Sequence, residues 1–155
     1  MRIKVFFVFI LISLMFYAGC ASGPGIKKIN KEIEGYELPE KPAENKAMVY
    51  VVRPGSTGFL IKFGVYINEK NSGNKVGSTG ANEYINFELD PAEYIIMSQA
   101  ENLAKYILQA EKNKTYFLKQ ISRTGLLFSR NKLVKISENE GMYWVKQLNK
   151  VLIKE

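Results

Sequence analysis

Short runs of β-branched and aromatic residues, separated by turn-forming residues, dominate the chain from Ala47 onwards. The first run covers residues 48–52 and ends at Arg53, which is followed by the turn signal Pro54-Gly55. Similar runs predict strands over residues 63–67, 75–79, 84–89, 94–98, 104–110, 115–121 and 133–136. About seven or eight short strands with turns between them are typical of a β-sandwich or a partly open barrel.

The run at residues 84–89 alternates, with Ile85, Phe87 and Leu89 on one face and Tyr84, Asn86 and Glu88 on the other. One face toward the core and one toward water is typical of an antiparallel sheet. Residues 90–93 predict a turn, and residues 112–114 predict the turn that closes the last hairpin. We therefore expect the strands to follow one another as an antiparallel meander.

Only the C-terminal part of the chain has a helical pattern. Over residues 139–152, Met142, Val145, Leu148 and Leu152 recur at spacings of three and four, which predicts one amphipathic helix. We expect its apolar stripe to pack on the sheet, the alternative being that it binds a partner. The fold class predicted is mainly β: an antiparallel β-sandwich or partly open barrel with one C-terminal amphipathic helix.

The N-terminus has the layout of a secretory signal. Two cations, Arg2 and Lys4, precede an apolar run over residues 5–16, which has the length of a signal-peptide core. The small residues Ala18 and Gly19 then precede Cys20, whose thiol can carry a diacylglycerol. This resembles the lipobox of bacterial lipoproteins, although Tyr17 stands where leucine is usual. We therefore expect a signal peptide over residues 1–19, with Ala18 and Gly19 at the cleavage site and lipid on Cys20.

An uncleaved membrane anchor is the alternative. A transmembrane helix needs about 20 mostly apolar residues, and the glycines and proline of residues 21–25 suit a lipid-exposed helix poorly. Glycine and proline also recur among lysines and glutamates up to Lys46, so residues 20–46 are interpreted as the lipidated cysteine and a flexible linker, in which a short helix near residues 27–34 can form. Residues 47–155 are then the β-rich domain with its C-terminal helix.

Several motifs after the linker occur together in one known family. They are Val49-Tyr50-Val51-Val52-Arg53-Pro54, Val65-Tyr66-Ile67-Asn68, Val76-Gly77, Tyr84, Leu89-Asp90-Pro91-Ala92-Glu93-Tyr94 and Thr115-Tyr116-Phe117. With the lipobox before them, they resemble the bacterial lipoprotein family filed as domain of unknown function 2846. The resemblance covers residues 47–136 and implies a β-rich domain in the cell envelope, without an activity. Ala92 departs from the family's usual Pro-Gly turn, which predicts a type I turn there because a positive φ is costly for alanine.

The composition excludes several kinds of catalytic and metal site. The chain has no histidine and one cysteine, so Ser-His-Asp and Cys-His catalysis and the usual zinc sites are excluded. Asp90 is the only aspartate, which excludes a calcium loop. Glu83, Glu88 and Glu93 lie close in sequence and could in principle do acid–base work on a sugar, but surface charges are the simpler interpretation. We therefore expect no metal, no cofactor and no enzymatic activity.

The chain is basic, with a formal net charge of +7, and its cations are scattered along the sequence. Such a modest excess is typical of a solvated surface, although it also permits attraction to anionic lipid or cell-wall polymer. A sequence cluster of cations, Lys119, Arg123, Arg130, Lys132 and Lys135, could suit nucleic acid. The expected envelope location argues against nucleic acid as a partner.

Two places remain as candidate interaction sites. Arg53 ends a very apolar strand, and it either caps carbonyls, pairs with a glutamate or captures a ligand. The apolar residues Leu126, Leu127 and Phe128 lie between Arg123 and Arg130. Apolar residues between cations suit contact with a membrane or a partner, and they suit a strand edge or core plug equally well.

These observations favour a lipoprotein anchored by lipid on Cys20, in the outer membrane and facing the periplasm. Ala21 directly after the cysteine resembles proteins passed on to that membrane. The β-domain is expected to be a non-catalytic module that binds an envelope protein or a cell-wall component. Two alternatives are a carboxylate-based enzyme acting on envelope polymers, and a lipid-contacting module that would need residues 126–128 exposed on the anchor side.

Overall fold

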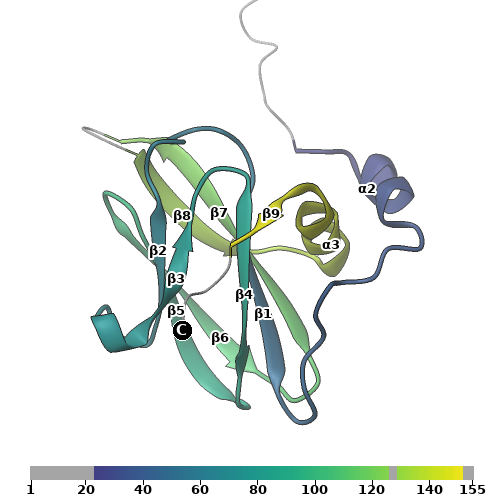
Figure 1. The fold of residues 1–155 in the computed structure, drawn as a ribbon, viewed down its shortest axis with the longest axis horizontal. Coiled ribbons are helices and arrows are strands. Elements are labelled where there is room, and N and C mark those ends of the chain that lie inside the picture. Colours follow the sequence, from purple (N-terminus) through teal and green to yellow (C-terminus); the bar gives the residue numbers. More distant parts are fainter. Residues whose placement is uncertain (1–22, 126–128, 152–155) are drawn as a thin grey trace, which may run out of the picture.

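The computed structural model describes residues 23–125 and 129–151, which form two β-sheets packed face to face with two helices outside one of them (Figure 1). The five-stranded sheet has the order β8 (Ser129–Lys135), β7 (Thr115–Thr124), β1 (Ala47–Arg53), β4 (Glu83–Leu89), β9 (Asn149–Lys150). The four-stranded sheet has the order β3 (Lys75–Thr79), β2 (Phe63–Ile67), β5 (Ala92–Gln99), β6 (Leu103–Ala110). The predicted mainly β fold is confirmed. Of the two predicted architectures, β-sandwich and partly open barrel, the structure is the β-sandwich.

Alternating residues of both sheets fill the space between them. Val49 and Val51 of β1 and Ile85 of β4 meet Val65 and Ile96 of the facing sheet, and all five are fully buried. A polar bridge crosses the same space. The buried side chain of Gln120 on β7 donates to Ser98 Oγ at 2.8 Å and accepts from Thr79 Oγ1 at 2.5 Å. Because each polar group has a partner, the bridge avoids the desolvation cost of an unpaired group.

The five-stranded sheet is mixed and not purely antiparallel. β1 pairs with β4 in the antiparallel direction and with β7 in the parallel direction. All seven residues of β1 are buried, because the inner face of the sheet meets the second sheet and the outer face meets α3 (Glu138–Gln147). The inward face of β4 is as predicted. On its other face Glu88 is exposed as predicted, but Tyr84 and Asn86 are buried.

Two of the predicted turns carry the chain from one sheet to the other. Residues 90–91 join β4 to β5, and residues 111–114 join β6 to β7, so neither closes a hairpin. The expected hairpin at residues 112–114 is therefore wrong. Asn113 has φ of 60°, a conformation that asparagine tolerates in tight connections of either kind. Ala92 has no positive φ, and it is the first residue of β5.

The C-terminal helix is shorter than predicted. α3 begins after Ser137, whose side chain caps the helix by accepting from Glu140 N, and it ends before Leu148. Residues 149–150 then pair with β4 in the parallel direction as β9, which stops the apolar stripe from continuing as helix. Leu152 lies outside the described residues. The helix packs on the sheet as expected, with Gly141 directly against the ring of Phe117.

Residues 23–46 lie along the domain, where the sequence suggested a flexible linker. They form α2 (Ile26–Ile33), which packs beside α3 through the buried Ile29 (Figure 1). Further on, Tyr50 donates from its hydroxyl to Glu40 O at 2.6 Å, and Glu88 accepts from Ala43 N at 2.6 Å. These contacts hold the segment against the five-stranded sheet, so within the described residues it does not act as a free spacer.

Candidate functional site

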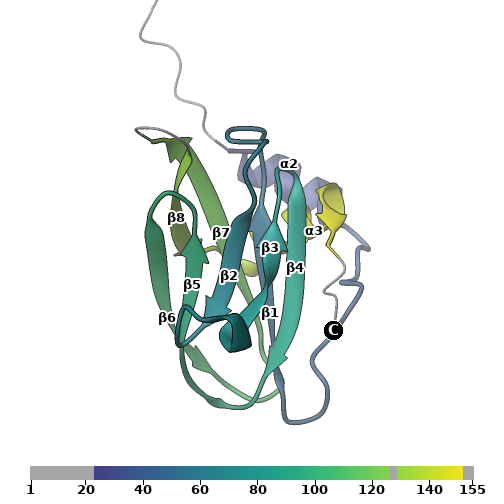
Figure 2. The same ribbon diagram turned by 60° about the vertical axis from the view of Figure 1, so that its left-hand side comes forward.

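The structure brings three of the candidate interaction residues to one end of the sandwich. Arg123 and Arg130 are cross-strand neighbours in the β7–β8 hairpin, and Arg53 ends β1 below the loop of residues 54–62. We call this end the loop end, defined by residues 54–62 together with Arg123 and Arg130 (Figure 2). The other candidates, Ala18, Gly19, Cys20, Leu126, Leu127 and Phe128, lie outside the described residues.

Arg53 is fully buried and caps four backbone carbonyls. Its Nη1 donates to Ile61 O at 2.6 Å and to Thr79 O at 2.9 Å, and its Nη2 donates to Gly58 O at 2.8 Å and to Thr57 O at 3.3 Å. The guanidinium also lies 3.5 Å from the ring centroid of Phe63. Burial lowers the pKa of the Arg53 guanidinium below its ordinary value, and the nearby charge of Glu83 offsets part of this effect.

These contacts assign Arg53 a structural role in place of ligand capture. Glu83 is its cross-strand neighbour, but no salt bridge between described residues involves Arg53. The charge is stabilised by carbonyl dipoles, three of which belong to the loop of residues 54–62. A planar guanidinium with several donors suits this task, because it can hold separate carbonyls in one fixed geometry.

The β7–β8 hairpin holds the same loop from the other side. The hydroxyl of Ser122 donates to Thr57 O at 2.8 Å, and it lies 2.7 Å from the hydroxyl of Ser129. Gly58 has φ of +67°, and a Cβ at this position would come within 2.5 Å of Ser129 Oγ. Glycine is therefore required both by the backbone conformation and by the close approach of the hairpin.

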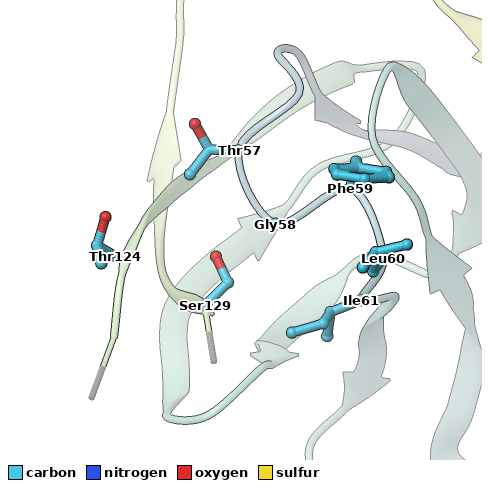
Figure 3. Close-up of a pocket in the computed structure, with 7 residues that line it drawn as sticks. All are labelled: Thr57, Gly58, Phe59, Leu60, Ile61, Thr124 and Ser129. Atoms are coloured by element: carbon cyan, nitrogen blue, oxygen red, sulfur yellow. The ribbon is translucent and has the colours of Figure 1, made fainter. Parts of the chain in front are cut away.

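Two large apolar side chains lie exposed on this fixed loop. Phe59 is 68% exposed and Leu60 is 84% exposed. They border a cavity of about 290 Å³ that is otherwise lined by Thr57, Gly58 and Ile61 of the loop and by Thr124 and Ser129 of the hairpin (Figure 3). None of these seven residues carries a titratable side chain, so the cavity offers hydroxyls and apolar surface but no acid or base.

Sequence reasoning missed Phe59 and Leu60. They do not belong to any alternating or helical pattern, and they follow Pro54, Gly55 and Gly58, which mark only a loop. The usable signal was a pair of bulky apolar residues within a turn-rich segment, the same signal that drew attention to residues 126–128. That the loop is held in place by Arg53 could not be deduced without the fold.

The loop end carries more exposed cations than anions. Lys62, Arg123 and Arg130 are exposed, and none of them takes part in a salt bridge with another described residue. Arg123 and Arg130 are directly opposite each other, and like charges in that position repel. The acidic residues near this end are Glu101, in the β5–β6 turn beside Ser129, and Glu83, which accepts from Gly80 N.

The described chain also begins at the loop end. Gly23 and Pro24 line a shallow groove of about 510 Å³ together with Pro54 and Gly55 of the loop. Lys28, Lys119, Tyr143 and Trp144 complete its lining. Both views show the start of the described chain at the end where the β7–β8 hairpin lies (Figures 1 and 2). Gly23 therefore lies beside Pro54 and Gly55, the first residues of the loop that carries Phe59 and Leu60.

A second surface with exposed apolar residues lies on the four-stranded sheet. Ile107 is 63% exposed and Leu103 is 37% exposed, both on the edge strand β6. They alternate with the inward-facing Tyr106 and Leu108, so they point away from the core. α2 and α3 lie outside the other sheet, so neither helix covers this face (Figure 1).

The glutamates considered for acid–base chemistry are separate in the structure. Glu83 accepts from Gly80 N, Glu88 accepts from Ala43 N, and Glu93 accepts from Gln109 Nε2. Glu88 is on the five-stranded sheet and Glu93 is on the four-stranded sheet. The part of the chain that the structure describes holds no group of three or more carboxylate, thiol or imidazole side chains that could bind a metal ion.

Comparisons with known proteins add no relative. No family profile, curated protein or solved structure matches the chain. Among the described residues, no helix has the length and apolar character needed to cross a bilayer.

Proposed function

We propose that the protein is a bacterial envelope lipoprotein, anchored by lipid on Cys20 in the outer membrane and facing the periplasm. The observation that carries the proposal is the N-terminal arrangement of two cations, an apolar run and the small residues Ala18 and Gly19 directly before Cys20. One acyl chain anchors a protein only marginally, whereas the two or three chains of a mature lipoprotein hold it stably. The motifs at residues 47–136 support membership of the lipoprotein family that they resemble.

We further propose that the β-domain is a non-catalytic interaction module that binds an envelope protein or a cell-wall component. The exposed Leu103 and Ile107 on the edge strand β6 support this, because exposed apolar side chains on an edge strand offer a surface for a partner. No specific observation favours the alternative of a carboxylate-based enzyme, since Glu83, Glu88 and Glu93 make separate contacts.

The anchor is tested by replacing Cys20 with alanine. The variant is expected to leave the membrane fraction or to be mislocalised, while its domain unfolds at the same urea concentration as the domain of the natural protein, because the described fold does not use residue 20. Cys20→Ser tests the same point with a near-isosteric hydroxyl. A Cys20→Ala protein that fractionates with membranes like the natural protein would contradict the lipid anchor.

The interaction module is tested by photo-crosslinking in cells. A photoreactive amino acid at Ile107 is expected to give one reproducible protein or glycan adduct. The matched control is the same amino acid at Lys31, which is exposed on α2, on the opposite side of the sandwich. Equal adduct patterns at both positions, or none at Ile107, would argue against a partner on this face.

A further inference from the structure

We infer that the loop end is a second membrane contact: Phe59 and Leu60 enter the interface of the bilayer that holds the Cys20 lipid, while Lys62, Arg123 and Arg130 face its anionic headgroups. The inference rests on the proposed lipid anchor and adds to it the face that the domain turns toward the membrane.

The chain between the anchor and the domain is short. Two residues, Ala21 and Ser22, separate Cys20 from Gly23. Fully extended chain spans at most about 3.6 Å per residue, so the three steps from Cys20 to Gly23 cover at most about 11 Å. Gly23 lines one groove with Pro54 and Gly55, at the base of the loop that carries Phe59 and Leu60. A linker of 26 residues would have allowed any orientation, but α2 and its contacts with the domain remove that freedom.

The two apolar side chains are exposed to water on a loop that is held in place. Phe59 and Leu60 are among the most exposed large hydrophobic residues of the described chain. Arg53 and Ser122 hold the carbonyls of the same loop, so the loop is kept in a shape that leaves both side chains in water. A flexible loop could fold such residues back onto the core, whereas a loop fixed in this way presents them outward. Aromatic and aliphatic side chains next to a bilayer gain free energy by leaving water.

The charge of the loop end also favours contact with an anionic bilayer. The exposed Lys62, Arg123 and Arg130 have no salt-bridge partner among the described residues. The directly opposed Arg123 and Arg130 repel each other, and an anionic headgroup between them would relieve that repulsion. Among the described residues at this end, Glu101 is the exposed acid, and the three exposed cations outnumber it. The surface is therefore attractive to anionic lipid.

The experiment uses the lipidated full chain in vesicles of three parts phosphatidylethanolamine to one part phosphatidylglycerol. Because the lipid occupies the thiol of Cys20, a Leu60→Cys variant offers a single free thiol for an environment-sensitive nitrobenzoxadiazole dye. The matched control is Ile107→Cys, which replaces another exposed aliphatic residue far from the groove of Gly23. Phe59→Cys is a second variant in case the dye at residue 60 disturbs the loop.

The dye at residue 60 is expected to shift its emission to the blue and to lose fluorescence when the vesicles carry nitroxide-labelled lipid. The dye at residue 107 is expected to do neither. Replacing phosphatidylglycerol with phosphatidylcholine should reduce the quenching at residue 60, since the cations then lose their anionic partner.

The outcomes separate the inference from the proposed function. If Cys20 itself takes up dye in the natural sequence, the thiol is free and the lipid anchor fails. If Cys20 is blocked and the protein is held on the vesicles, but residues 59 and 60 are as accessible as residue 107, the anchor stands and the membrane-contacting loop end is wrong. Shielding of residue 60 that needs an added protein or glycan would also overturn it, because the surface would then bind a different partner.

Discussion

Replacing Arg53 with methionine removes every hydrogen-bond donor of the side chain while keeping a long apolar stem. In the folded protein, the four carbonyls of Thr57, Gly58, Ile61 and Thr79 then lose their donor. The carbonyls of the exposed loop can take up water, but the carbonyl of Thr79, at the end of β3, is buried. Arg53→Met therefore leaves at least one buried acceptor unpaired and opens the loop that carries Phe59 and Leu60.

The expected loss of unfolding free energy follows from these contacts. A buried acceptor left unpaired costs about 1–3 kcal/mol, and hydrogen bonds from a charged donor contribute about 1.5–3 kcal/mol each. Part of this is offset, because methionine does not carry the desolvation cost of a buried guanidinium. We expect a net loss of about 2–4 kcal/mol. The unfolding free energy of Arg53→Lys should lie between those of the natural protein and Arg53→Met, because one ammonium cannot hold four carbonyls in the same geometry.

The assay is urea unfolding of protein that begins at Ala21, followed by the fluorescence of Trp144. Arg130→Met is the matched control, because it makes the same chemical change at an exposed position, where substitutions usually alter stability by less than about 0.5 kcal/mol. If Arg53→Met costs less than about 1 kcal/mol, the carbonyl-capping role of Arg53 is overestimated. A large loss in Arg130→Met would instead indicate that the exposed arginine stabilises the hairpin.

Two further predictions concern the outer face of the five-stranded sheet. Alanine normally stabilises a helix, but Gly141→Ala should lower the unfolding free energy by about 1–3 kcal/mol, because the new Cβ would lie 2.1 Å from Phe117 Cγ. The measurement is the thermal unfolding midpoint, and an unchanged or raised midpoint would show that the helix shifts at little cost. Glu40 has its pKa lowered below the ordinary 4.5 by hydrogen bonds from Lys150 and Asn86, so it stabilises the fold while ionised and loses this effect as the pH falls below 4.5. Glu40→Gln should therefore lower the urea midpoint at pH 7, and the difference from the natural protein should close in acid; a difference that is equal at pH 7 and pH 3 would contradict the assignment.

The strands could be predicted from the sequence, because their signals are local. β-branched and aromatic runs mark β1 to β8 within about two residues for most of them, and the inward positions Ile85, Phe87 and Leu89 of β4 follow from simple alternation. The division of strands between two sheets could not be predicted. Turns at residues 90–91 and 111–114 use the same residue types whether they close a hairpin or cross between sheets.

The parallel pairing of β1 with β7 and the position of residues 23–46 depend on contacts between distant parts of the chain. α2 contributes a single buried residue, Ile29, which is too little apolar surface to distinguish a packed helix from a linker by pattern. For Arg53, carbonyl capping was one of the alternatives expected from the sequence, but which carbonyls it caps could not be predicted. Phe59 and Leu60 gave no periodic signal, since residues exposed on a loop obey neither helical nor strand spacing.

The proposed function depends above all on Cys20 carrying lipid as the first residue of the mature protein. It is tested most directly by the mass of the N-terminal peptide of the protein purified from cell envelopes. A lipid-anchored protein gives a peptide that begins at Cys20 and carries a diacylglycerol on the thiol. A peptide that retains Met1 and the residues of the leader, or one that begins at Cys20 with a free thiol, would contradict it.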